Sequence, residues 1–340
     1  MSIEKRLLGR TGLRVSPLTL GTMTFGGRSS VEESEAIIDR ALAAGINFID
    51  TANVYNAGKS EQIVGAALKK NGHRHRIVLA TKVHGNMHAG DALEPTQAGN
   101  SRRAIIEQVE ASLKRLQTDY IDLYQIHRPQ PETPIDETLR ALDDLVRSGK
   151  VRYIGSSTFA AWQVVESLWV SKELGLNRFV TEQPPYNLLD RRIERELIPA
   201  ARTFGIGLIP WSPLAGGFLT GKYRLKGEQP DGRFSDRSHV RSASLLDNSR
   251  AFEAVQKLEG IAAEKKVPVS QLALAWTVQQ PGITSSIIGP RTREQLADNL
   301  AALELRFSRE DLARIDAVSP PGDVIVPFYN AEFGPHPQRV

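Results

Sequence analysis

The chain has 340 residues, 41% of them hydrophobic and 24% charged, which is typical of a folded globular protein and excludes a disordered or fibrous chain. The formal charge is +4, but Lys and Arg are scattered among nearly as many acidic residues, which argues against nucleic-acid binding. Cysteine is absent, which excludes disulfide and thiolate chemistry and favours a cytoplasmic setting. The first residues lead into no apolar segment, and prolines and glycines break the longest uncharged run, 204–221, so we expect neither a signal peptide nor a membrane span.

Along the chain, apolar strand-like runs alternate with amphipathic helical patterns. A short pair of segments on either side of Thr11-Gly12 has the character of a β-hairpin. The expected strands are 18–21, 46–50, 77–82, 120–127, 151–156, 179–183, 207–211 and 285–289. The expected helices are 31–44, 60–69, one beginning at Ser101, one around 139–146, then 160–174, 191–204, 255–265, 270–279 and 292–303.

Eight strand–helix units in about 300 residues are the size of a closed (β/α)8 TIM barrel, an α/β fold. The alternative is an open doubly wound sheet. We prefer the barrel because no Gly-x-Gly-x-x-Gly follows the first strand and no change in composition marks two domains. We therefore expect one domain over 1–340, with long excursions at 84–100 and 213–250 and a C-terminal tail at 320–340.

In a barrel the carboxyl ends of all strands lie on one face, so the residues there should converge. The residues at these ends are Asp50, Lys82, His127, Ser156, Gln183, Trp211 and Gly289. Tyr55 follows Asp50 within a loop. A nearby lysine cation stabilises a phenolate and makes the tyrosine proton easier to give away, while Asp50 would hold Lys82 charged and His127 would orient a carbonyl. The four residues predict a site that polarises a C=O group for reduction by hydride.

Two other patterns are weaker. Gly216-x-x-x-x-Gly221-Lys222 is close to a phosphate-binding P-loop, but Tyr223 follows where a small hydroxyl is needed for Mg²⁺. His84 and His88 have the spacing of helical metal ligands, but Gly and Asn between them predict a polar loop. We therefore expect no metal site and no nucleoside-triphosphatase.

A series of motifs from Arg6 to about Val318 resembles the aldo-keto reductase family, in particular the branch with bacterial general reductases and potassium-channel β subunits. The motifs are Gly9-x-x-Gly12-Leu13-x-Val15-Ser16, Leu20-Gly21-Thr22, Phe48-Ile49-Asp50-Thr51-Ala52-x-x-Tyr55, Thr81-Lys82, Ile121-Asp122-Leu123-Tyr124-Gln125-Ile126-His127, Ile154-Gly155-Ser156-Ser157, Glu182-Gln183-x-x-Tyr186-Asn187 and Trp211 to Tyr223. The resemblance implies a (β/α)8 barrel and a catalytic tetrad of Asp50, Tyr55, Lys82 and His127, with Tyr55 as the general acid.

The resemblance also implies a nicotinamide cofactor. Trp211 would stack on the nicotinamide, Ser156 and Gln183 would hold its carboxamide, and Ser157 stands where the family usually has Asn. Arg291 would favour NADP(H), with NAD(H) possible, because a cation there suits the 2′-phosphate. The full set of expected cofactor contacts is Thr22, Met23, Ser156, Ser157, Gln183, Trp211, Ser212, Pro213, Leu214, Gly216, Lys222, Arg233, Gly289, Arg291, Gln295 and Asn299.

The resemblance implies a small carbonyl substrate, an aldehyde, ketone or keto-sugar reduced reversibly to an alcohol. The expected substrate contacts are Phe25, Tyr55, His127 and Arg128, with Phe328 and Tyr329 as further pocket residues. A second hypothesis is a regulatory subunit that binds the cofactor to sense redox state and turns over little. His127 completes the tetrad and favours the enzyme.

Overall fold

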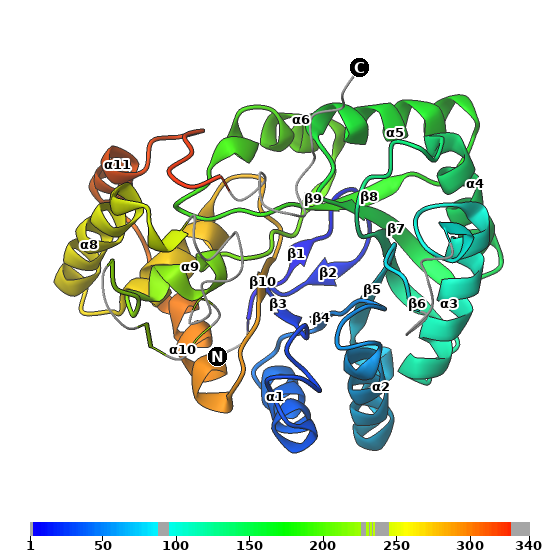
Figure 1. Cartoon of the computed structure of the whole chain (residues 1–340), viewed down its shortest axis with the longest axis horizontal. Coiled ribbons are helices and arrows are strands. Elements are labelled where there is room, and N and C mark those ends of the chain that lie inside the picture. The colour runs from blue at the N-terminus through cyan, green and yellow to red at the C-terminus, as the bar shows by residue number, and fades with distance from the viewer. Residues whose placement is uncertain are drawn as a thin grey trace.

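The structure, a computed structural model of the whole chain, describes residues 3–87, 95–225, 229–230, 232, 234 and 245–327. Strands gather at the centre of the molecule and helices surround them (Figure 1). None of the described helices is both long and apolar enough to cross a membrane.

Eight strands form one parallel sheet in which neighbours follow chain order. They are β3 (Leu18–Gly21), β4 (Phe48–Asp50), β5 (Val78–Val83), β6 (Ile121–Ile126), β7 (Val151–Ser157), β8 (Phe179–Gln183), β9 (Gly207–Leu208) and β10 (Ser286–Ile288). Hydrogen bonding gives the order β10-β3-β4-β5-β6-β7-β8-β9. The two end strands also meet, because Leu208 pairs with Ile283 in a parallel bridge and the Ile287 N–H donates to the Pro210 carbonyl at 2.8 Å. The sheet is therefore a (β/α)8 barrel, as predicted.

Helices lie on the outside of the barrel, where α1 to α9 connect its strands and α10 and α11 follow the last strand (Figure 1). They are α1 (Val31–Ala43), α2 (Lys59–Asn71), α3 (Arg102–Leu116), α4 (Ile135–Arg147), α5 (Ala161–Glu173), α6 (Leu197–Phe204), α8 (Ser249–Glu264), α9 (Val269–Gln279), α10 (Arg293–Ala301) and α11 (Arg309–Val318). Side chains that accept a backbone N–H start several of them, namely those of Ser30, Ser101, Asn248, Thr292 and Ser308. Most predicted bounds agree within a few residues.

Two elements differ from the prediction. β9 ends at Leu208, not at 211, because Pro210 has no N–H to continue the ladder. Trp211 nevertheless keeps its place beside the barrel through an isolated parallel bridge with Pro185. Helix α11 was not predicted from the sequence, although Ser308 and Asp311 form a capping box that marks its start.

The N-terminal hairpin, β1 (Arg6–Leu7) and β2 (Arg14–Val15), lies against the amino ends of the barrel strands. Leu8 and Val15 pack in a separate apolar cluster with residues of the barrel interior. Those residues are Phe48, Val78, Ala80, Leu123 and Ile209. Gly9, with φ of +56°, makes this fit possible, since a Cβ there would lie 2.6 Å from the Val180 carbonyl oxygen. The interior is therefore apolar at the end opposite the strand carboxyl termini.

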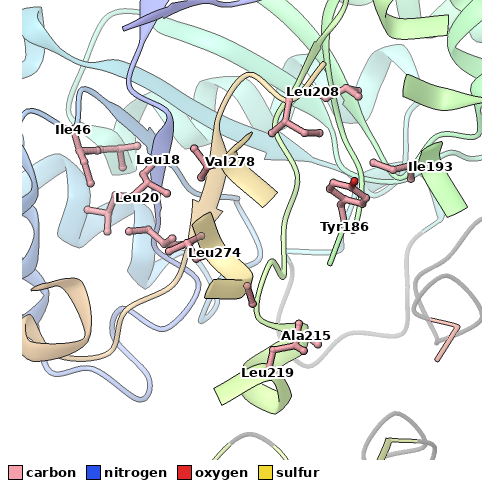
Figure 2. Close-up of a cluster of buried hydrophobic side chains, with 14 of the residues drawn as sticks. Leu18, Leu20, Ile46, Tyr186, Ile193, Leu208, Ala215, Leu219, Leu274 and Val278 are labelled. Carbon is pink, nitrogen blue, oxygen red and sulfur yellow. The ribbon is translucent and has the colours of Figure 1, made fainter. Parts of the chain in front are cut away.

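A larger core lies between the barrel and its helices. Figure 2 shows part of it, including Leu18 and Leu20 from β3 and Leu274 and Val278 from α9. Successive residues of a strand face opposite sides, so Leu18 and Leu20 join this core while Thr19 hydrogen-bonds to Ser285 at 2.6 Å. The same alternation decides which strand-end residues face the barrel interior.

Candidate active site

A cavity of about 1040 Å³ lies at the carboxyl ends of the barrel strands. The predicted site residues that line it are Thr22, Met23, Asp50, Tyr55, His127, Arg128, Ser157, Gln183, Trp211, Ser212, Pro213, Leu214, Gly216, Lys222, Gly289, Arg291, Gln295 and Asn299. Residues from distant parts of the chain thus face one space, which is what the barrel topology predicts.

Four polar residues form a contact network at one end of the cavity. The Lys82 ammonium donates to Asp50 Oδ2 at 2.6 Å, to the Thr51 carbonyl at 2.8 Å and to the Tyr55 hydroxyl at 3.2 Å. The rings of Tyr55 and His127 meet edge to face with centroids 5.7 Å apart. Lys82 is fully buried and does not line the cavity itself, but it hydrogen-bonds to the hydroxyl of Tyr55, which does. The four residues predicted as a tetrad are therefore linked in one chain of contacts, from Asp50 through Lys82 and Tyr55 to His127.

Two glutamines fix the orientation of the Asp50 carboxylate. Gln125 and Gln183 donate their side-chain N–H groups to Asp50 Oδ1 at 3.1 and 2.9 Å. Oδ1 is thus occupied by neutral donors, and Oδ2 is left for Lys82. Gln183 was expected at the site for another role, whereas Gln125 was not expected there. Gln125 lies on β6, two residues before His127. That spacing is the signal that would have found Gln125, because residues two apart in an extended segment face the same side.

The loop that carries Tyr55 has an unusual backbone. Asn56, Ala57 and Gly58 have φ values of +49°, +54° and +86°, so three successive residues are left-handed. Such a turn is costly for residues other than glycine and needs support from its surroundings. Asn56 supplies it by donating its side-chain amide to the carbonyls of Met23 and Phe25 at 2.9 and 2.7 Å. Asn56 therefore ties the Tyr55 turn to the loop after β3.

The electrostatics of the network set two protonation states. Burial alone would lower the pKa of the Lys82 ammonium, but Asp50 and Tyr55 outweigh it, so the pKa is raised and Lys82 is a cation. Burial, reinforced by the positive charges of Lys82 and Arg128, lowers the pKa of His127 well below its usual value. His127 is therefore a neutral imidazole at pH 7, able to donate one hydrogen bond.

The other end of the cavity is rich in cations. Arg28, Lys222 and Arg291 line it, and a Cβ added at Gly289 would meet no atom within 4 Å, so glycine leaves open space beside them. The side chain of Gln295 accepts the Arg291 N–H at 2.8 Å. This donor set fits a long ligand that carries phosphate groups. The residues present therefore fit a nicotinamide dinucleotide reaching from the cations to the tetrad.

The structure corrects the placement of two predicted residues. Ser156 is fully buried on the outer side of β7, where its hydroxyl donates to Glu182 Oε2 at 2.6 Å, and it does not line the cavity. Ser157, one residue later, faces the cavity instead, because neighbouring strand residues point to opposite sides. Phe25 is also fully buried, in the core around the barrel, rather than at the cavity wall.

Some predicted positions lie outside the described residues: Arg233, Phe328, Tyr329 and His88. His84 hydrogen-bonds to Asn100 at 3.0 Å. Across the described ranges there is no group of three His, Cys, Asp or Glu side chains that could hold a metal ion.

Arg28, which also lines the cavity, was not predicted. It donates to the Gly232 carbonyl at 3.1 Å, so it joins the loop after β3 to the excursion after β9. A contact across 204 positions leaves no pattern in one sequence. Its positive charge in a loop at a strand end was the only hint that the sequence offered.

Comparison with known proteins agrees with this geometry. Residues 17–320 match the Aldo/keto reductase family. The chain is 42% identical to an uncharacterized oxidoreductase, YrpG, of Bacillus subtilis, over 94% of this chain and 96% of the relative. It is 39% identical to a probable voltage-gated potassium channel subunit beta of rice, Oryza sativa, over 93% of this chain and 96% of the relative. A versiconal hemiacetal acetate reductase of Aspergillus parasiticus is 35% identical over 92% of this chain and 96% of the relative.

Proposed function

Because the chain belongs to the aldo/keto reductase family, we propose that it transfers hydride from NADPH to the carbonyl of an aldehyde, ketone or keto-sugar, reversibly giving an alcohol. The family and the oxidoreductase relatives make the chain an NAD(P)H-dependent oxidoreductase. The observation that carries the proposed chemistry is the contact of Lys82 with both Asp50 and the Tyr55 hydroxyl. We propose a cytoplasmic setting, which the cysteine-free sequence favours.

The proton comes from Tyr55. When bound, the nicotinamide supplies the hydride that reduces the carbonyl carbon. The carbonyl oxygen then takes the proton of the Tyr55 hydroxyl, which becomes a phenolate. Lys82, 3.2 Å from that oxygen, stabilises the negative charge, and Asp50 keeps Lys82 charged and aimed. In the reverse direction the phenolate accepts the proton of the alcohol.

His127 and Arg128 would recognise the substrate. The neutral His127 imidazole lies beside the Tyr55 ring and can donate a hydrogen bond to the carbonyl oxygen as negative charge develops there. The Arg128 guanidinium lines the same part of the cavity and donates to the Thr158 hydroxyl at 3.2 Å. A cation next to the reacting group favours carbonyl compounds that carry hydroxyl or anionic groups.

The test of the reaction is the substitution Tyr55→Phe, which removes the proton donor and keeps the ring. We expect kcat to fall by about 10²–10⁴-fold while the Kd for NADPH stays near that of the wild type. NADPH oxidation with a panel of aldehydes, ketones, keto-sugars and quinones measures turnover, and fluorescence titration measures binding. Turnover that survives the substitution would show that Tyr55 is not the general acid.

NADP(H) is the proposed cofactor because Arg291 lines the end of the cavity where a phosphate would lie. Replacing Arg291 with Gln should raise the Kd for NADPH by about tenfold or more and leave the Kd for NADH within about twofold. Equal effects on the two cofactors would exclude a role for Arg291 at the 2′-phosphate.

The second candidate, a regulatory subunit that binds the cofactor with little turnover, is suggested by the relative named as a potassium channel β subunit. Tight NADPH binding with negligible turnover on the whole panel would favour it. Steady turnover of any aldehyde would favour the enzyme.

A further inference from the structure

A second cavity, of about 330 Å³, lies at the opposite end of the barrel. Its walls come from the N-terminal hairpin, the end of α4, the start of β7, the start of β8 with the segment before it, and the segment before β9, so it faces the amino ends of the strands. Its polar side chains include those of Arg10, Arg152, Arg178, Thr11 and Asn177. It shares no lining residue with the cavity that holds the tetrad.

The three arginines give this cavity a positive charge that no lining residue balances, because none of the described residues in its wall is acidic. The Arg178 guanidinium donates to the Phe204 carbonyl at 2.7 Å, and the Arg152 guanidinium donates to the Gly149 carbonyl at 2.8 Å. These carbonyls hold the guanidinium groups in place without neutralising them. Both groups therefore keep N–H donors and full charge for a ligand.

Arg10 is the third cation. Within the described ranges its side chain has no hydrogen-bond or ion-pair partner, while its backbone N–H donates to the Gly205 carbonyl at 2.9 Å. Burial and the charge of Arg10 together lower the pKa of Arg178, so the two guanidinium groups are near enough to repel each other. A bound anion would remove this repulsion.

Asp143 on α4 is already engaged by other partners. Asp143 accepts both the backbone and the side-chain N–H of Asn177 at 2.8 Å, and it also pairs with Arg147. Asp143 therefore holds Asn177 at the cavity wall.

We propose that this cavity binds an oxyanion, either free phosphate or the phosphate group of a small metabolite. Guanidinium groups present planar pairs of donors that match the oxygens of a phosphate, and Thr11 and Asn177 add neutral donors. The volume is that of a small-ligand site. Because Arg10 and Arg152 are exposed to solvent, the dissociation constant for phosphate should be about millimolar.

The test is calorimetric titration of the protein saturated with NADP⁺, so that the cations of the first cavity are already covered. Inorganic phosphate is added at constant ionic strength set with NaCl, since screening alone changes surface electrostatics. We expect one saturable site. Arg10→Gln and Arg178→Gln should each weaken phosphate binding by roughly tenfold. The matched control is Arg14→Gln, which removes an exposed arginine of the same hairpin outside the cavity and should leave the affinity unchanged.

Glycerol 3-phosphate distinguishes the two sources of the anion. Tighter binding than inorganic phosphate assigns the site to a phosphorylated metabolite, and equal binding assigns it to the free ion. Thermal unfolding and aldehyde turnover of each variant show that the fold and the first cavity are intact. A heat of phosphate titration that does not saturate would refute the site. Equal affinities for phosphate in Arg178→Gln and Arg14→Gln would also refute it. Neither result depends on whether the protein reduces carbonyls.

Discussion

Asp50 and Lys82 form a buried ion pair at 2.6 Å, and the substitution Asp50→Asn tests its contribution to stability. The change keeps the size of the side chain and removes its charge. An amide has one acceptor oxygen, whereas Asp50 accepts from Lys82 on Oδ2 and from Gln125 and Gln183 on Oδ1. The variant therefore leaves either the ammonium or the glutamines facing an N–H group.

The size of the effect follows from the geometry. At the observed 2.6 Å and an effective dielectric constant of about 20, the attraction between the two charges is about 6 kcal/mol. The amide keeps part of this as a hydrogen bond, and breaking a buried pair by removing one partner typically costs about 3–5 kcal/mol. We expect the free energy of unfolding at pH 7 to fall by about that amount, measured by urea unfolding.

The loss should depend on pH in a defined direction. In the wild type the pKa of Lys82 is raised, so its contribution to stability is complete below its unfolded pKa and is lost as pH rises through the folded value. Without Asp50, burial would lower the pKa of Lys82, and the variant would gain stability as Lys82 loses its proton. The difference in the free energy of unfolding between the Asp50→Asn variant and the wild type should therefore be smaller at pH 9.5 than at pH 7.

The control is Asp144→Asn, which removes the partner of Arg102 in an exposed pair. An exposed pair contributes little, so this loss should stay below about 1 kcal/mol. If Asp50→Asn destabilises the protein no more than Asp144→Asn does, the buried ion pair does not have the strength inferred from its geometry.

Three further predictions concern neighbouring residues. Burial raises the pKa of Glu182 from 4.5 to about 8, so the folded state holds a proton that the unfolded state releases. The free energy of unfolding of the wild type should therefore fall by about 3 kcal/mol from pH 6 to pH 9. Urea unfolding of Glu182→Gln should show no such fall. Asn56→Ala removes both side-chain hydrogen bonds that hold the Tyr55 turn, so kcat should drop about tenfold while the Kd for NADPH changes little. An unchanged kcat would show that these two hydrogen bonds are not needed to position Tyr55. Ser157→Ala should raise the Kd for NADPH by about threefold to tenfold, whereas Ser156→Ala should lower stability and leave that Kd alone; the reverse result would restore Ser156 as the cofactor contact.

The sequence was sufficient to predict the barrel and to predict that Asp50, Tyr55, Lys82 and His127 lie close together. Strand and helix periods gave the eight units, and Asp50, Lys82 and His127 each stand at a strand end that the topology brings together. Ser156 and Ser157 were both expected as cofactor contacts, but neighbouring strand residues point to opposite sides, so only Ser157 lines the cavity. Counting by twos along β7 from Tyr153, which packs with the cluster of the barrel interior, reaches Ser157.

Other parts of the site could not be read from one sequence. The bonds of Gln125 and Gln183 to Asp50 join positions 75 and 133 residues apart, and the motifs that contain the two glutamines do not show that both bind Asp50. The arginine cavity likewise combines the hairpin with segments near 152, 178 and 205. Such groups meet only after the barrel closes, so their chemistry depends on the fold rather than on any pattern in the chain.

The alternation of side chains along each β-strand also relates the two ends of the barrel interior. On β4 and β5, Phe48 and Ala80 lie two residues before Asp50 and Lys82, so an apolar layer lies directly beneath the ion pair. The hairpin covers that layer through Leu8, and water is kept from the charges on that side. In a dry surrounding the field of Lys82 at the Tyr55 hydroxyl is weakly screened, which is the condition for stabilising a phenolate. In the proposed function, the packing of the hairpin therefore contributes to the role of Tyr55 as proton donor, although the hairpin lies at the opposite end of the barrel.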